Sequence, residues 1–274
     1  MRRLVLRLVG LGLALGLASV PFAESALAQS GSPLLSRIVK SGELRVGMSG
    51  DQPPLNFKSK SGEMVGLEVD LAKAIAGAMG VQLKIVQRPF GELLAALEKG
   101  DVDLVMSGMT ITPERNMQFA FVGPYYVSGK SILTKSSTLS KAKQASDLDK
   151  PGVAFAALAG STSQHFVEVV LPKAKLVPTK DYDEAVQLLL KDKVQALVAD
   201  QEICVVTGMR HPKAGLAALA RPLTIEPIGI AVAPGDPLFV NFLENTLAAL
   251  RAAEALDALH ARWIENSEWL SQLP

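Results

Sequence analysis

Cysteine is nearly absent from this 274-residue sequence, in which Cys204 is the single example. One cysteine excludes an intrachain disulfide, and a position so far from the N-terminus excludes attachment of a lipid at a signal-peptide cleavage site. Cys204 lies in the apolar run "ICVV", so we interpret it as a small buried hydrophobic residue. Histidine is also rare, and His165, His211 and His260 are too scattered for a metal-ligand cluster. The sequence therefore predicts neither a metal site nor a cofactor.

An excess of charge is also missing, since 28 basic and 27 acidic residues give a formal net charge of +1. A balanced chain lacks the basic surface with which proteins bind nucleic acid, so no nucleic-acid partner is expected. Phosphate-binding glycine loops and nucleophile elbows are missing too, which argues against the common enzymes that depend on them.

A hydrophobic run stands at the N-terminus, where "MRRLVLRLVGLGLALGLASVPFAESALAQS" has a basic start, an apolar centre and small residues at its end. This pattern predicts a signal peptide at residues 1–28, cleaved after Ala28, by an export route that the paired arginines leave open. The apolar centre is short for a membrane span. Removal of three arginines and Glu24 leaves 25 basic and 26 acidic residues, so the mature protein has a charge of about −1. We expect a periplasmic protein that does not span the membrane once it is processed.

After this segment, strand-like and helical patterns alternate in "LRVGM", "GLEVDLAKAIAGAMG", "VQLKIVQ", "FGELLAALEKG" and "DVDLVMSG". The stretch from about Leu67 to Met79 has apolar residues at every fourth position, and Gly80 and Gly100 have the place of helix-ending glycines. Alternating strands and helices predict an α/β protein with mainly parallel sheets flanked by helices.

An internal similarity indicates two related lobes. Residues 92–108, "ELLAALEKGDVDLVMSG", align without a gap with residues 184–200, "EAVQLLLKDKVQALVAD". The alignment places Gly108 opposite Asp200, each just beyond the end of a predicted strand. Ligands of open α/β sheets bind beyond the carboxyl ends of strands, so both positions are expected to face one shared cleft.

Two extended segments, at 125–135 and 221–234, flank the second lobe. They predict a two-stranded hinge, with crossings near 128–132 and 223–228, about which a ligand favours a closed form. The expected domains are one lobe made of residues 31–129 and 226–274, with the return segment and C-terminal helices in the second part, and a second lobe at 130–225.

Arg115 occupies an unusual place, the first turn of a predicted helix. Thr112, Pro113 and Glu114 have the residue types of an N-cap, a first helical position and a first-turn acid. A cation in that turn opposes the helix dipole. Arg115 is therefore either a solvated side chain paired with Glu114 or another surface acid, or a side chain placed to receive an anion.

These motifs resemble the solute-binding family 3 group, the periplasmic amino-acid-binding proteins of ABC importers with the two-lobed type II periplasmic-binding fold. The segments that carry the likeness are "LRVGMSGDQPPLNFKSKSGEMVGLEVDLAKAIA", "GDVDLVMSGMTITPERNMQFAFVGPYY", "LAGSTSQHF" and "ALVADQE". They occur in the order and spacing of that family and span essentially the whole mature chain. They are much less specific for the ligand.

The resemblance implies roles for individual residues. Arg115 would bind the α-carboxylate of an amino acid with its planar guanidinium. The hydroxyl groups of Thr110 and Thr162 would bind the same carboxylate from the two lobes. Beside Thr162, Ser161 begins a predicted helix whose free N–H groups suit an anion, although ordinary capping needs the same residues.

The remaining part of the implied site concerns the ammonium group and the side chain of the ligand. The ammonium would lie between the Gly108 carbonyl and the Asp200 carboxylate, with Ser107 beside them. The pocket for the ligand side chain departs from the usual pattern at Leu55 and Gln52, where many relatives have aromatic residues. Phe90 is the remaining aromatic candidate. Fewer stacking faces favour a small aliphatic or polar ligand side chain. Asp51 either contacts a polar group of the ligand or caps its loop.

The resulting prediction is a monomeric receptor, not an enzyme, that delivers a polar amino acid or related small molecule to an ABC permease. Some relatives on this fold are dehydratases, for which Glu202 is the nearest candidate acid in this sequence. A ligand-sensing module for a signalling receptor is the other alternative, because both roles need the same closing cleft.

Overall fold

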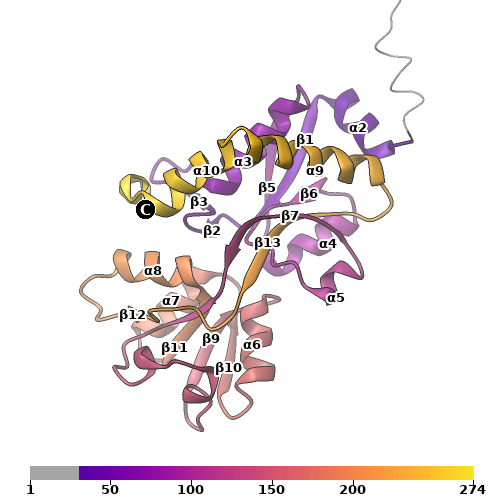
Figure 1. Ribbon diagram of the computed structural model, residues 1–274. Coiled ribbons are helices and arrows are strands. Elements are labelled where there is room, and N and C mark those ends of the chain that lie inside the picture. Colours follow the sequence, from indigo (N-terminus) through magenta and orange to yellow (C-terminus); the bar gives the residue numbers. More distant parts are fainter. Residues whose placement is uncertain (1–30) are drawn as a thin grey trace, which may run out of the picture.

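A computed structural model describes residues 31–274, so the predicted signal peptide lies outside the described residues. Figure 1 shows two lobes, one above the other, joined by the long strands β7 and β13. Among residues 31–274, no helix is both long and apolar enough to cross a membrane.

The first lobe contains a five-stranded sheet with the order β5-β1-β6-β13-β7. Strands β1 and β5 are parallel, as are β1 and β6, whereas β13 is antiparallel to both of its neighbours. Four of the five strands therefore run in the same direction. The bounds are β1 (Glu43–Met48), β5 (Gln82–Gln87), β6 (Leu104–Val105), β7 (Ala120–Ser128) and β13 (Glu226–Val232).

The second lobe repeats this arrangement with the order β10-β9-β11-β8-β12. Here β8 is the opposed strand, and its register sets Lys130 directly across from Asp200 on β11. The helix-strand similarity of the sequence corresponds to α4–β6 in one lobe and α7–β11 in the other, and β6 and β11 are the third strands of their sheets. The bounds are β8 (Lys130–Thr134), β9 (Ala154–Leu158), β10 (Lys175–Thr179), β11 (Ala196–Asp200) and β12 (Ala217–Ala218).

Helices cover the sheets, and a small three-stranded sheet borders the first lobe. Its strands are β2 (Asp51–Gln52), β3 (Asn56–Lys58) and β4 (Met64–Val65). The first-lobe helices are α2 (Pro33–Ser41), α3 (Leu67–Ala78), α4 (Leu93–Glu98), α5 (Pro113–Asn116), α9 (Pro237–Ala252) and α10 (Ala255–His260). The second-lobe helices are α6 (Thr162–Val170), α7 (Tyr182–Leu190) and α8 (Gln201–Arg210). The predicted α/β class with two lobes of mainly parallel strands is confirmed.

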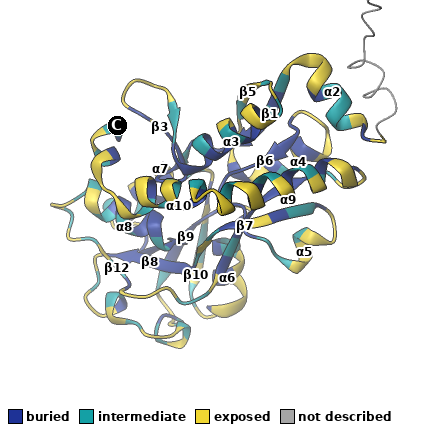
Figure 2. Ribbon diagram, turned by 45° about the horizontal axis from the view of Figure 1, so that its top comes forward, coloured by how far each residue is buried: buried dark blue, intermediate teal, exposed yellow. Residues whose placement is uncertain are grey.

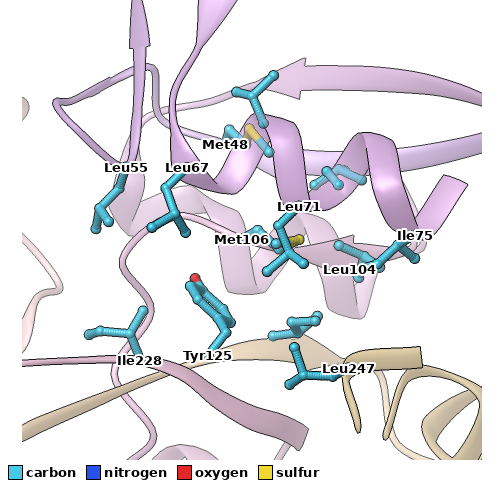
Figure 3. Packing of buried hydrophobic residues seen from close by; sticks show 14 of the residues in the cluster. Met48, Leu55, Leu67, Leu71, Ile75, Leu104, Met106, Tyr125, Ile228 and Leu247 are labelled. Atoms are coloured by element: carbon cyan, nitrogen blue, oxygen red, sulfur yellow. The ribbon is translucent and has the colours of Figure 1, made fainter. Parts of the chain in front are cut away.

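The core follows the predicted apolar pattern. The inner strands of both sheets are largely buried, whereas the edge strand β5 has no buried residue, and the outer faces of the helices are exposed (Figure 2). Leu67, Leu71 and Ile75 on α3 pack into the first-lobe core, where Figure 3 shows them facing the strands and Tyr125. The C-terminal residues Trp263 and Trp269 belong to the same cluster, so they pack rather than line a site.

The chain passes between the two sheets twice. It leaves the first sheet at the end of β7, and Gly129 alone separates β7 from β8. It returns between β12 and β13, and Glu226 at the start of β13 pairs with Ser128 at the end of β7. These segments run side by side, which is the arrangement that a two-stranded hinge requires.

Candidate functional site

Arg115 reaches from the first lobe to the second. Thr112 caps the short helix α5 by accepting a hydrogen bond from the Arg115 amide at 3.2 Å, as the sequence predicts. The guanidinium donates to the carbonyl oxygens of Thr110, at 2.9 Å, and Gly160, at 3.1 Å. Both acceptors are neutral, and within residues 31–274 no carboxylate lies at ion-pair distance from it. Burial lowers the pKa of Arg115. The side chain thus remains a half-buried cation without a close counter-ion.

The two predicted threonines meet across the cleft. The hydroxyl oxygens of Thr110 and Thr162 lie 3.3 Å apart, so the lobes are closed on each other at this point. Ser161 is the N-cap of α6, because its hydroxyl accepts from the Gln164 amide and donates to the Leu158 carbonyl. Ser161 therefore has the capping role, and Thr162 presents the first-turn hydroxyl to the other lobe.

Ser107 and Gln52 belong to one polar network under the cleft. The Ser107 hydroxyl accepts from the Ser49 amide at 3.0 Å, and the Gln52 amide group donates to the hydroxyls of Ser49 and Ser107. Gly108 has a φ of +58°, and a Cβ there would lie 2.4 Å from the Gln52 side-chain oxygen. Glycine is required because this backbone is left-handed and the Gln52 side chain fills the space.

Glu68 holds the Gly108 loop from beneath. Its carboxylate is fully buried and accepts from the Gly108 amide at 2.7 Å, from the Tyr125 hydroxyl and from the Asn56 side chain. Burial raises the pKa of this carboxyl, and the three donors oppose that rise. Sequence reasoning missed Glu68, because a polar residue in an amphipathic helix is ordinarily placed on the solvent face.

Asp200 has a partner that sequence reasoning also missed. Lys130, 2% exposed, pairs with the Asp200 carboxylate, and its ammonium lies 3.6 Å from Glu226. The second carboxylate oxygen of Glu226 accepts from the Thr224 hydroxyl at 2.9 Å. The pairing of β8 with β11 brings together Lys130 and Asp200, which are 70 positions apart in sequence. No local sequence pattern predicts this contact.

A cleft of about 450 Å³ lies between the lobes beside the Arg115 corner. Its walls include Ser49, Asp51 and Phe90, together with Lys180 and Asp181 from the second lobe. The Phe90 ring also lies under the Arg115 guanidinium, at 5.9 Å from its centroid, and so separates this cleft from that corner.

Asp51 lies in the wall of this cleft, whereas Leu55 does not. One Asp51 oxygen accepts from the Tyr182 amide at the start of α7 in the other lobe, at 3.0 Å. The other oxygen has no hydrogen-bond partner within residues 31–274, and burial raises the pKa of this carboxyl. Leu55 is fully buried in the first-lobe core (Figure 3). Its side chain packs near Gly108 and does not line the cleft.

Glu202 lies at the start of α8 beside the hinge. The Ser128 hydroxyl donates to one of its carboxylate oxygens at 2.5 Å, and the other oxygen is buried without a partner within residues 31–274. Burial, and then the negative charge of Asp200, raise the pKa of Glu202 to about 8. The folded protein therefore keeps the proton on this carboxyl to a higher pH than the unfolded chain does.

This proton makes stability depend on pH. The folded protein binds this proton more tightly than the unfolded chain does. The stabilisation that results is fully present below pH 4.5 and is lost as the pH rises to about 8. We expect the free energy of unfolding to fall over that window by up to about 1.4 kcal/mol per pH unit. Urea denaturation at several pH values measures this slope. Glu202→Gln should flatten it, whereas Glu244→Gln, at an exposed position, should leave it unchanged. An equal slope in wild type and Glu202→Gln would contradict this assignment.

Comparison with known proteins places the chain in a family. The cyclohexadienyl dehydratase of Pseudomonas aeruginosa is 26% identical over 91% of this chain and 92% of its own length. The ABC transporter arginine-binding protein 1 of Escherichia coli is 28% identical, over 81% and 90%. A solved binding component of an ABC transporter from Wolinella succinogenes, complexed with lysine, is 36% identical, with a TM-score of 0.79 over 84% of this chain and 98% of that one. The family model for bacterial extracellular solute-binding proteins, family 3, matches residues 44–266, and the chain belongs to this family.

Proposed function

We propose that the protein is a periplasmic solute receptor that binds an amino acid or a related small carboxylate between its lobes and delivers it to an ABC permease. The observation that carries this proposal is Arg115, a half-buried cation that hydrogen-bonds two carbonyl groups and has no carboxylate at ion-pair distance within residues 31–274. A guanidinium has five N–H donors, of which these two bonds use two, so three remain and two of them can form a bidentate pair with a carboxylate.

The neighbouring hydroxyl groups complete a carboxylate site in this proposal. Thr110 comes from the first lobe and Thr162 from the second, so one anion would contact both. The start of α6 adds free backbone N–H groups near Thr162, which favour negative charge. Because the donors belong to different lobes, bound ligand would favour the closed arrangement about the two crossings.

The rest of the ligand has two regions to occupy. An α-ammonium would lie between the Gly108 carbonyl and Asp200, and Ser107 and Gln52 would fix the Gly108 loop from the side. The ligand side chain would pass Phe90 towards the 450 Å³ cleft, whose walls include Asp51. Relatives whose names state arginine, glutamine or cystine binding support an amino-acid class of ligand without selecting one member.

The test is a thermal-shift screen of the purified mature protein against the L-amino acids and small 2-oxo and 2-hydroxy acids. A ligand at a hundredfold over its dissociation constant should stabilise the protein by about 2.7 kcal/mol. For a domain of this size that is roughly 5–11 °C in Tm. The primary amine that lacks the carboxylate of the best ligand serves as the control and should have no effect. A library without any shift, or an equal shift with the amine, would contradict the proposal.

A dehydratase is the second candidate, and Glu202 is the observation that favours it. A general acid needs a pKa near the working pH, and burial together with the charge of Asp200 raises the pKa of Glu202 to about 8. The first-named relative above is a cyclohexadienyl dehydratase. NMR spectra of each screening hit incubated with the protein separate the candidates: an unchanged ligand supports a receptor, and loss of water from the ligand supports an enzyme.

A further inference from the structure

Lys130 and Asp200 form a donor and an acceptor side by side where the chain enters the second sheet, at the start of β8 and the end of β11. They are opposite residues of an antiparallel strand pair, so their side chains meet within one sheet and need no movement of the lobes. The exposed fractions of their side chains are 2% and 6%. Water screens such a pair weakly, and the Asp200 charge already has a counter-ion before any ligand arrives.

The pair lies near the carboxylate site along the hinge strands. Thr110 forms a bridge with Ile228 on β13, and Glu226 at the start of the same strand pairs with Ser128, two residues before Lys130. The Lys130 ammonium lies 3.6 Å from Glu226, which is the second acid near it. In agreement with this placement, the charges of Glu226 and Asp200 oppose the lowering of the Arg115 pKa by burial.

We propose that Lys130 is a specificity-determining residue, and that with Asp200 it lets the α-position of the ligand be an oxo or hydroxyl group as well as an ammonium. This inference rests on the proposed function. An ammonium group has three N–H donors, and the ion pair with Asp200 leaves Lys130 able to donate to an oxygen of the ligand. The second Asp200 oxygen can accept from a ligand ammonium, but Lys130 places a like charge beside it.

A site with Asp200 alone would strongly reject a ligand without an amine, because the carboxylate would remain buried and unpaired. Lys130 removes that penalty. The receptor is therefore expected to take 2-oxo and 2-hydroxy acids together with the amino acids that share their side chains.

Calorimetric titration with matched ligands tests the inference. The probes are L-alanine, pyruvate and L-lactate; L-leucine and 4-methyl-2-oxopentanoate; L-phenylalanine and phenylpyruvate; and L-glutamate and 2-oxoglutarate. In the set that binds most tightly, the wild-type dissociation constants of the amino and oxo forms should agree within about tenfold, or about 1.4 kcal/mol. Lys130→Met should shift their ratio at least about tenfold towards the amino acid, and Asp200→Asn should shift it similarly towards the oxo acid.

Opposite shifts distinguish a contact with the ligand from a structural role. If both variants weaken both forms by the same factor, or if wild type binds only the amino form, the inference is overturned while the receptor function stands. If no probe of any set binds wild type although the thermal-shift screen finds a ligand, the inference is overturned and the receptor function stands; if the screen also finds no ligand, the two fail together. Should one single variant not fold, the variant that does fold decides the outcome. An amino-to-oxo ratio equal to that of Arg221→Lys, at an exposed position, would then overturn the inference, and a shift of at least about tenfold in the direction given for that variant would support it.

Discussion

Arg115→Lys is expected to weaken binding of the best carboxylate ligand by about 2–5 kcal/mol, roughly 30-fold to several thousand-fold, and to leave the fold intact. The guanidinium presents a planar pair of donors to a carboxylate, whereas an ammonium makes a single point contact. The lysine side chain would also lose one of the two carbonyl contacts, at Thr110 or Gly160. Isothermal titration calorimetry measures the affinity, and circular dichroism checks the fold.

The matched control for this substitution is Arg221→Lys, because Arg221 is exposed. It should bind the ligand with wild-type affinity. Near-native affinity of Arg115→Lys would instead return Arg115 to the role of a surface arginine and remove the central support for the receptor function.

Glu68→Leu should lower stability by about 3–5 kcal/mol, or roughly 6–20 °C in Tm. The substitution leaves the Gly108 amide, the Tyr125 hydroxyl and the Asn56 side chain without their acceptor in a fully buried place. Each unsatisfied donor costs about 1–3 kcal/mol. The variant no longer has to bury a carboxyl group, and this offsets part of that destabilisation. Differential scanning calorimetry measures the change.

Two companion variants sharpen this result. Glu68→Gln keeps one acceptor and nearly the same volume, so its loss should be smaller than that of Glu68→Leu. Glu63→Leu changes an exposed residue five positions earlier and should stay close to wild type. Equal Tm values for Glu68→Leu and Glu63→Leu would show that the carboxylate does not hold the Gly108 loop.

Periodic features of this fold follow from the sequence because they are local. The spacing of Leu67, Leu71 and Ile75 predicts helix α3, and Thr112 with Pro113 predicts the start of α5. The alignment of residues 92–108 with 184–200 predicts that β6 and β11 have the same position in their sheets, where each is the third strand. Each of these inferences needs only neighbours in the chain.

Pairings between distant segments of the site were not predictable in this way. Lys130 reaches Asp200 because one strand of the second sheet runs against the others, and a pattern of alternating strands and helices does not reveal that reversal. Glu68 is buried because three donors converge on it from Asn56, Gly108 and Tyr125. The roles of Arg115 and Thr162 in ligand binding remain predictions, although the structure brings both to one corner.

The 3.3 Å contact between Thr110 and Thr162, with the Arg115–Gly160 bond beside it, makes ligand binding an exchange reaction. The groups proposed to hold the carboxylate bond to one another across the cleft. A ligand that takes them replaces these bonds, so its affinity reports the difference between its own contacts and those that it displaces rather than the sum of its contacts. A substitution at Thr162 would weaken the contact between the lobes together with the contact to the ligand. Its effect on affinity would then be smaller than the number of contacts to the ligand implies.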